Sequence, residues 1–164
     1  MFQHQRHKQP QQLDRPRELV VMCMPLRSNI NLSRILRTTS CFGISRLIAC
    51  GRPKIDSKIS RDATSQIEVE LHRSLLPVLE KMKLDQFQLV GLEQTTGSQS
   101  LYSFAFSRRT ALVIGNERVG LPDEVLRLLD HVVEIPMYGL PHSLNVATAT
   151  DMAIYEYCRQ FPRG

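Results

Sequence analysis

The chain has 164 residues, 42% of them hydrophobic, which is enough for one domain with a sizeable core and too little for two comfortable ones. Its longest unbroken apolar run covers residues 19–26, far below the roughly 18 residues of a membrane span. The first 18 residues contain no apolar stretch of the kind that a secretory signal requires. We therefore expect a cytoplasmic protein of one domain and exclude a membrane protein.

The formal net charge of +5 is unevenly distributed along the chain. Residues 27–61 carry eight basic residues and one acidic residue, a net charge of +7, whereas residues 62–107 have a net charge of −3. A solvated face is the ordinary explanation for a run of charge. A polyanionic partner explains the asymmetry better, because neutralising phosphates requires clustered Arg and Lys.

The N-terminal residues 1–18 are predicted to form a flexible basic arm. They contain five glutamines, two prolines and no apolar periodicity. Their basic residues are Arg6, Lys8, Arg15 and Arg17. The folded domain is predicted to cover residues 19–164.

From residue 19 onward, short apolar runs alternate with segments of helical periodicity. The predicted strands cover residues 19–22, 47–49, 67–71, 88–92, 111–114 and 132–135. The predicted helices cover residues 32–42, 58–63, 75–83, 122–129 and 147–158. Continuous apolar strands that alternate with helices predict an α/β fold with a parallel sheet covered by helices on both faces.

Three loops follow predicted strands and carry glycine or polar residues. They cover residues 91–96, 115–120 and 136–145, and the last places Ser143 and Asn145 where a helix begins. Each could be an ordinary turn with a helix cap. Because ligands of parallel sheets bind beyond the carboxyl ends of the strands, we expect the three loops to form one pocket.

Two common nucleotide-binding classes are excluded by these loops. Gly115 and Gly120 have the outer spacing of a phosphate-binding loop, but the Lys-Ser/Thr pair that handles phosphate and magnesium is absent. The sequence also contains no G-x-G-x-x-G, so the usual dinucleotide fingerprint is missing.

Cysteines and histidines do not predict a metal site. Cys23, Cys41, Cys50 and Cys158 have no C-x-x-C spacing, and none of the histidines forms a metal-binding pair at helical spacing. Buried free thiols are the expected state of the four cysteines.

Three segments in chain order carry a family resemblance. They are residues 31–38 with Phe42-Gly43, residues 112–117 with Gly120, and residues 135–137 with Gly139 and residues 143–146. Over about residues 19–160 the sequence resembles the TrmH-like (SpoU-type) RNA ribose 2′-O-methyltransferases of the SPOUT superfamily. The resemblance implies a SPOUT fold with a C-terminal trefoil knot, S-adenosylmethionine as cofactor, and a homodimer with active sites at its interface.

The resemblance also implies roles for individual residues. The implied cofactor-binding residues are Thr95, Gly115, Ile135, Met137, Gly139 and Leu144. The implied catalytic residues are Arg37, Asn31, Glu117, Ser143 and Asn145, and those that meet RNA are Arg27, Arg34, Arg37 and Arg118. A guanidinium is effectively never deprotonated, so we expect Arg37 to hydrogen-bond the ribose oxygen and the adjacent phosphate. Glu117 is expected to pair with an arginine, for example one of a second subunit.

The leading hypothesis is thus an enzyme that methylates a ribose 2′-oxygen in structured RNA, either transfer or ribosomal RNA. One alternative is an RNA-binding or ribosome-assembly protein that keeps the fold without transferring a methyl group. Intact Arg37, Glu117, Ser143 and Asn145 argue against it. Another alternative is a methyltransferase acting on a base, which Ser143-Leu144-Asn145 disfavours. Neither a metal nor a membrane is expected to take part.

Overall fold

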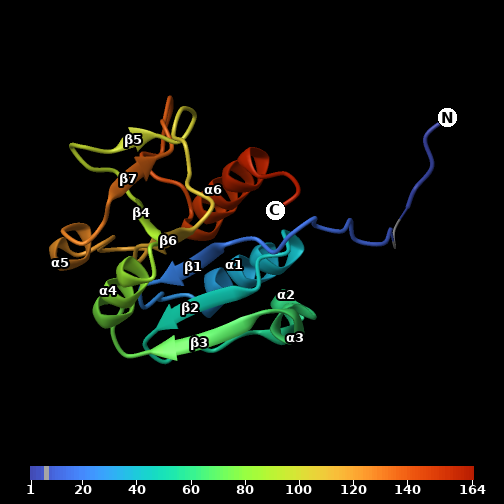
Figure 1. Ribbon diagram of the computed structural model, residues 1–164, viewed down its shortest axis with the longest axis horizontal. Coiled ribbons are helices and arrows are strands. Elements are labelled where there is room, and N and C mark those ends of the chain that lie inside the picture. The colour runs from blue at the N-terminus through green and yellow to red at the C-terminus, as the bar shows by residue number, and fades with distance from the viewer. Residues whose placement is uncertain (6–7) are drawn as a thin grey trace.

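Seven parallel strands form one sheet in the computed structural model, which describes residues 1–5 and 8–164 (Figure 1). The strands are β1 (Leu19–Cys23), β2 (Arg46–Cys50), β3 (Glu68–His72), β4 (Gln88–Leu92), β5 (Gln99–Ser100), β6 (Thr110–Ile114) and β7 (His131–Glu134). Their order across the sheet is β3-β2-β1-β6-β4-β7-β5. Every pairing is parallel, so all carboxyl ends meet at one edge.

Helices cover both faces of this sheet. They are α1 (Asn29–Cys41), α2 (Ser57–Ser60), α3 (Ala63–Gln66), α4 (Leu76–Leu84), α5 (Asp123–Leu126) and α6 (Val146–Gln160). Alternate residues of the fully buried β1 belong to two separate cores. Leu19, Val21 and Cys23 pack with apolar residues of α1 and α6, whereas Val20 and Met22 pack with those of α4 and α5. Continuous apolar strands result because both faces are buried.

The predicted α/β class and its six strands are confirmed, with differences at short elements. Sequence reasoning missed β5, which has two residues and no apolar run, and α3, a single turn. The predicted helix over 122–129 is wrong in length, since α5 ends at Leu126. After α5, the backbone N–H groups of Leu128 and Leu129 bond carbonyls three residues back, which tightens the chain out of the α-helix.

The switch in strand order lies between β1 and β6. The chain passes from β1 outward to β2 and β3, and it later enters β6 on the other side of β1. In Figure 1 the arrowheads of β1, β2 and β3 lie at the same end of the sheet. The loops after β1, β4, β6 and β7 consequently gather beyond the carboxyl edge, where open α/β sheets bind ligands.

Arg17 lies in the segment that was expected to be a flexible arm, but its side chain is buried, with 8% of its surface exposed. Its guanidinium donates to the carbonyls of Phe42 at 2.8 Å, of Phe161, and of Pro162 at 3.3 Å. These carbonyls follow the ends of α1 and α6. Arg17 therefore joins two helix ends, which does not fit the expectation that it belongs to a flexible arm.

Residues before Arg17 differ in their surroundings. Arg15 donates to the Gly164 carbonyl at 3.2 Å, and Lys8 lies in the exposed segment that extends away from the domain (Figure 1). Arg6, the remaining basic residue of the predicted arm, lies outside the described residues.

Three of the four cysteines are buried free thiols as expected, and Cys41 is exposed. Burial raises the pKa of Cys23 to about 12, so that thiol stays protonated at neutral pH. Among the helices of the described residues, none is long and apolar enough to cross a membrane.

Candidate functional site

A pocket of about 740 Å³ opens at the carboxyl edge of β4, β6 and β7, a volume suited to a nucleoside-sized ligand. Its walls come from the loop before α1, the loops after these three strands and the start of α6. The lining residues are Arg27, Ser28, Asn31, Leu92, Glu93, Gln94, Ile114, Gly115, Asn116, Glu117, Arg118, Gly120, Glu134, Ile135, Met137, Ser143, Leu144, Asn145, Val146 and Ala149. The three loops that the sequence singled out do converge on one pocket.

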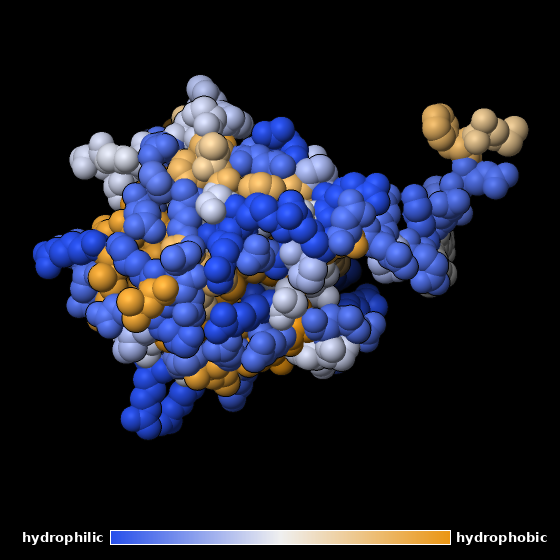
Figure 2. All heavy atoms as spheres, in the orientation of Figure 1, coloured by the Kyte–Doolittle hydropathy of each residue, from blue (hydrophilic) through white to orange (hydrophobic). Residues whose placement is uncertain are grey.

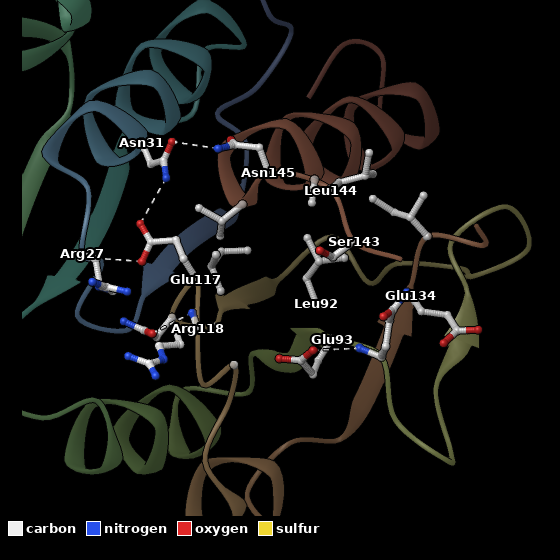
Figure 3. A pocket seen from close by; sticks show the side chains of 18 of the residues that line it. Arg27, Asn31, Leu92, Glu93, Glu117, Arg118, Glu134, Ser143, Leu144 and Asn145 are labelled. Carbon is white, nitrogen blue, oxygen red and sulfur yellow. Dashed lines mark hydrogen bonds between the residues drawn. The ribbon is translucent and has the colours of Figure 1, made fainter. Parts of the chain in front are cut away.

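Glu117 anchors the loop after β6 to the start of α1. Its carboxylate accepts hydrogen bonds from the backbone N–H of Arg27 at 2.8 Å and of Ser28 at 3.1 Å. It also accepts one from the Asn31 side-chain amide at 3.1 Å (Figure 3). Partial burial raises the pKa of Glu117, but these hydrogen bonds outweigh it and hold the pKa below its ordinary value. Glu117 was expected to pair with an arginine side chain. Within the described chain its carboxylate accepts instead from two backbone N–H groups and one side-chain amide.

Asn31 links Glu117 to Asn145 on the other side of the pocket. The Asn145 side-chain nitrogen donates to the Asn31 oxygen at 3.1 Å, as Figure 3 shows. The Asn145 oxygen accepts from the backbone N–H of Ala147 at 2.9 Å and of Thr148 at 3.3 Å, which caps α6. Asn31 itself does not cap α1, because Ser28 occupies that position. A continuous hydrogen-bonded chain, here called the amide relay, thus joins Glu117, Asn31 and Asn145.

Close backbone packing shapes the loop after β6. Gly120 has a φ of +67°, and a Cβ built on Gly115 would lie 2.7 Å from the Gly120 carbonyl carbon. Any side chain at Gly115 would therefore displace the backbone of this loop. The Asn116 side-chain oxygen accepts from the backbone N–H of Arg118 at 2.9 Å and of Val119 at 3.2 Å, which closes the turn.

Glu93 holds the far end of the same loop and was missed by sequence reasoning. One carboxylate oxygen accepts from the Leu121 backbone N–H at 3.0 Å, and the other accepts from the Gln94 backbone N–H at 3.0 Å. A Cβ on Gly120 would lie 2.3 Å from the first oxygen. The only sequence feature that could have pointed to Glu93 is its position directly after the end of β4.

Glu134 is a second pocket residue that the sequence did not single out. Its carboxylate accepts a hydrogen bond from the Ser98 hydroxyl at 2.6 Å, and Leu101 donates its backbone N–H to the Glu134 carbonyl at 2.8 Å. Glu134 thereby ties the segment around β5 to the end of β7.

Ten of the fourteen residues implied by the resemblance line the pocket. They are Arg27, Asn31, Gly115, Glu117, Arg118, Ile135, Met137, Ser143, Leu144 and Asn145. Thr95, Gly139, Arg34 and Arg37 do not line it. Thr95 lies in a turn beside the pocket, where its backbone N–H donates to Ser98 at 3.3 Å.

Arg37 does not reach the pocket of its own chain. It lies on α1 beyond Asn31, with its side chain exposed. The apolar residues Ile30, Met152 and Tyr155 are 50%, 43% and 59% exposed on the same two packed helices, α1 and α6. An exposed arginine and exposed apolar residues thus lie on the same pair of helices outside the pocket.

The polar groups of the site can act on a ligand through hydrogen bonds and charge. No group of three or more His, Cys, Asp or Glu side chains arranged for a metal ion occurs in residues 1–5 and 8–164. Arginines 27 and 118 lie at the pocket beside Glu117 (Figure 3). The nucleoside-sized pocket combines two arginines with three glutamates at the switch point of a parallel sheet, which is where α/β proteins bind nucleotide-like ligands.

Comparison with known families identifies the group more narrowly. The chain belongs to the SpoU rRNA Methylase family, whose model matches residues 18–155. It is 31% identical over 150 residues to a tRNA (guanosine(18)-2′-O)-methyltransferase of Aquifex aeolicus, covering 89% of this chain and 71% of that protein. It is 32% identical to the TARBP1 enzyme of Mus musculus with the same activity in its name, covering 87% of this chain and 9% of that protein.

Solved structures agree with this assignment. The fold is similar to that of the A. aeolicus TrmH/SpoU tRNA modifying enzyme, with a TM-score of 0.85, 28% identity and coverage of 92% of this chain and 78% of that one. It is also similar to the SpoU methyltransferase AviRb from Streptomyces viridochromogenes in complex with AdoMet. That comparison has a TM-score of 0.78, 28% identity and coverage of 93% and 64% of the two chains.

Proposed function

We propose that this chain transfers a methyl group from S-adenosylmethionine to a ribose 2′-hydroxyl of structured RNA. The observation that carries the proposal is the amide relay, which joins the three family segments around one nucleoside-sized pocket. The proposal is further supported by relatives named as tRNA and rRNA 2′-O-methyltransferases. Transfer RNA is the favoured substrate, because several relatives carry tRNA in their names.

The residues present fit the proposed cofactor. Gly115, Ile135, Met137 and Leu144 would pack on the adenosine, with Gly115 allowing close backbone approach. When bound, S-adenosylmethionine supplies an electrophilic methyl group on a sulfonium. Carboxylates of the pocket, such as Glu93, favour a cationic ligand through their negative charge. Thr95 and Gly139 remain proposed cofactor contacts from beside the pocket.

Chemistry at the ribose requires an aligned oxygen and a destination for its proton. With the cofactor bound, the ribose 2′-oxygen would be the nucleophile for its methyl group, and the hydroxyl proton would pass to solvent water. A hydroxyl is a weak nucleophile at neutral pH, so alignment and stabilisation of developing negative charge must supply most of the acceleration. Ser143 lies at the pocket beside the amide relay, where its hydroxyl would hydrogen-bond the ribose.

Arg37 would act from a second copy of the chain. Within one chain it lies outside the pocket, on the surface that α1 and α6 share with Ile30, Met152 and Tyr155. Packing of two copies through this surface would cover the apolar side chains and bring Arg37 of one copy toward the pocket of the other. The proposed homodimer and its knotted chain are predictions that rest on the family resemblance, and a cytoplasmic location stays a prediction from the sequence.

The test is methyl transfer itself. Purified protein is incubated with methyl-labelled S-adenosylmethionine and total RNA from a strain that lacks the gene, and 2′-O-methyl sites are mapped against RNA of the parent strain. We expect a site that is present in the parent, absent in the deletion strain and restored in vitro. Bound RNA without any restored site would instead support the RNA-binding protein without transfer activity.

A further inference from the structure

Four adjacent strands of the sheet are each followed by a loop that carries an arginine. Across the sheet in the order β3-β2-β1-β6, the loops that follow the strands carry Arg73, Arg52, Arg27 and Arg118. All four side chains are exposed. Arg118 and Arg27 line the pocket, and Arg52 and Arg73 lie progressively farther from it along the sheet. We call these four residues the arginine row.

Close contacts join each loop of the arginine row to the next. The Asn116 side chain donates to the Pro25 carbonyl at 2.6 Å, which joins the loops after β6 and β1. A Cβ on Gly51 would lie 3.4 Å from the Pro25 side chain, so the loop after β2 packs on the loop after β1. The Gly51 backbone N–H donates to the His72 carbonyl at 3.0 Å, which joins β2 to β3. The arginine row is therefore built on a rigid edge.

The loop after β2, which carries Arg52, also contributes Lys54 to this edge. The Lys54 backbone N–H donates to the Asn29 side chain at 3.1 Å, and the Asp56 backbone N–H donates to the Ser33 hydroxyl at 2.8 Å. Ser33 is fully buried in α1. The loop after β2 is thus pinned to α1, and its lysine is exposed beside the arginine row.

None of the four arginines has an ion-pair partner within 4.0 Å in the described part of the chain. By contrast, Lys81 pairs with Asp85 at 2.6 Å and Lys83 with Asp130 at 3.3 Å. Glu117 is the carboxylate that lies beside Arg27 and Arg118, and its oxygens accept hydrogen bonds from backbone and amide groups. The positive charge of the arginine row is therefore available to a partner.

We propose that the arginine row is the track for the RNA backbone that flanks the methylated nucleotide, running from the pocket toward β3. This inference rests on the proposed function, because it takes RNA as the substrate. Four adjacent strands span roughly 14 Å at a spacing of ~4.8 Å. A strand of a nucleic-acid helix carries one phosphate per roughly 3.4 Å of helix axis, so several phosphates fall along that length. Hydrophilic atoms project past the end of β3 in Figure 2, where the row ends.

The test separates the outer arginines from the chemistry. Arg52→Ala/Arg73→Ala removes two positive charges far from the amide relay, and Lys81→Ala/Lys83→Ala removes two from α4 as a matched control. Binding of a labelled tRNA transcript is measured by anisotropy at several salt concentrations, together with AdoMet affinity by calorimetry. We expect the arginine variant to bind the transcript about tenfold more weakly, with a salt slope shallower by roughly 1.5. The control should match the wild type.

Kinetics and a second variant complete the test. The arginine variant should raise the KM for RNA and leave kcat at saturating RNA and the affinity for AdoMet unchanged, because its contacts contribute uniform binding. Arg52→Gln/Arg73→Gln keeps polar side chains and should behave in the same way. The proposed track is wrong if either arginine variant keeps the RNA affinity and salt slope of the wild type. It is also wrong if the lysine control loses as much RNA affinity as the arginine variant. If the wild-type chain transfers no methyl group while the row still controls RNA affinity, the proposed function fails and the track stands.

Discussion

The side-chain nitrogen of Asn145 lies 3.1 Å from the side-chain oxygen of Asn31, and this contact fixes the orientation of both amides. The Asn145 oxygen must accept, because it faces two backbone N–H groups at the start of α6. Its nitrogen therefore donates to Asn31, whose own nitrogen is left to donate to Glu117. Neither amide can be turned over without placing two donors or two acceptors together.

The first prediction is that Asn31→Asp lowers the free energy of unfolding by about 1–3 kcal/mol near neutral pH. The new carboxylate at position 31 would face the carboxylate of Glu117 in place of the amide donor. Repulsion between the two carboxylates raises their pKa in the folded variant. A group with a raised folded pKa contributes stability that is present below its unfolded pKa and lost as the pH rises. The deficit relative to wild type should therefore shrink between pH 8 and pH 5 in urea unfolding. Asn29→Asp is the control, since the Asn29 side chain only accepts from Lys54. A deficit that does not vary with pH would contradict the relay.

The wild-type relay has the opposite dependence on pH. Because hydrogen bonds lower the folded pKa of Glu117, its contribution to stability is present above the unfolded pKa and lost as pH falls through the folded pKa. Glu117→Gln should remove this acid-labile contribution, so that wild type and variant converge in unfolding free energy in strong acid. If the unfolding free energies of wild type and Glu117→Gln differ by the same amount down to pH 2, the Glu117 hydrogen bonds are energetically unimportant.

Arg37→Ala should abolish methyl transfer while leaving AdoMet affinity nearly intact, because Arg37 lies outside the pocket of its own chain. Arg37→Lys should not restore transfer, since a point charge cannot reproduce a planar group with several donors. Arg34→Ala, on the same helix, is the comparison and should raise the KM for RNA without abolishing kcat. Mixing Arg37→Ala with a Ser143→Ala variant should recover part of the activity if the arginine acts across a dimer. Wild-type turnover in either Arg37 variant would show that the catalytic centre is misplaced.

Glu93→Gln should weaken AdoMet binding by about tenfold, because an amide offers one oxygen where two backbone N–H groups require two. Glu124→Gln, an exposed site on α5, is the charge-matched control. Gly120→Ala should be worse than Glu93→Gln, since its Cβ would lie 2.3 Å from the Glu93 carboxylate at a positive φ. Glu93→Ala/Gly120→Ala removes the clash between the two residues, so its calorimetric loss should be less than the sum of the losses in Glu93→Ala and Gly120→Ala. Strict additivity would show that the two residues act independently.

Metal should have no part in cofactor binding. The structure offers no cluster of metal-ligating side chains in its described residues, and the resemblance calls for none. Calorimetric titration with AdoMet in the presence of a chelator should give the same affinity as titration without it. Binding that disappears in chelator and returns with a divalent cation would contradict this expectation.

The layered fold was predictable because its signals are local and strong. Buried strands such as β1 and β6 are unbroken apolar runs, and α1 and α6 have clear helical periodicity. Pocket residues within motifs, such as Asn145, could also be identified through the resemblance. Glu93 could not, because its role depends on the distance between two loops that are far apart in the sequence. Arg17 was misread for the same reason, since charge and polar neighbours in the sequence indicate an exposed arm, whereas its partners are carbonyls near residues 42 and 161.

The burial of Arg17 divides the N-terminal segment into two parts with different expected effects. Deleting residues 1–12 removes Lys8 but keeps Leu13, which lies 3.1 Å from the Cβ position of Gly43, and Arg17. This truncation should flatten the salt dependence of RNA binding and raise the KM for RNA without changing kcat or the thermal unfolding temperature. Deleting residues 1–17 should in addition lower the unfolding temperature by several degrees, because the carbonyls after α1 and α6 lose their shared donor. Arg17→Ala in the full chain separates the two effects, since it should reproduce the loss of stability and keep the wild-type salt slope. An unchanged unfolding temperature in Arg17→Ala would show that the helix ends are held without it.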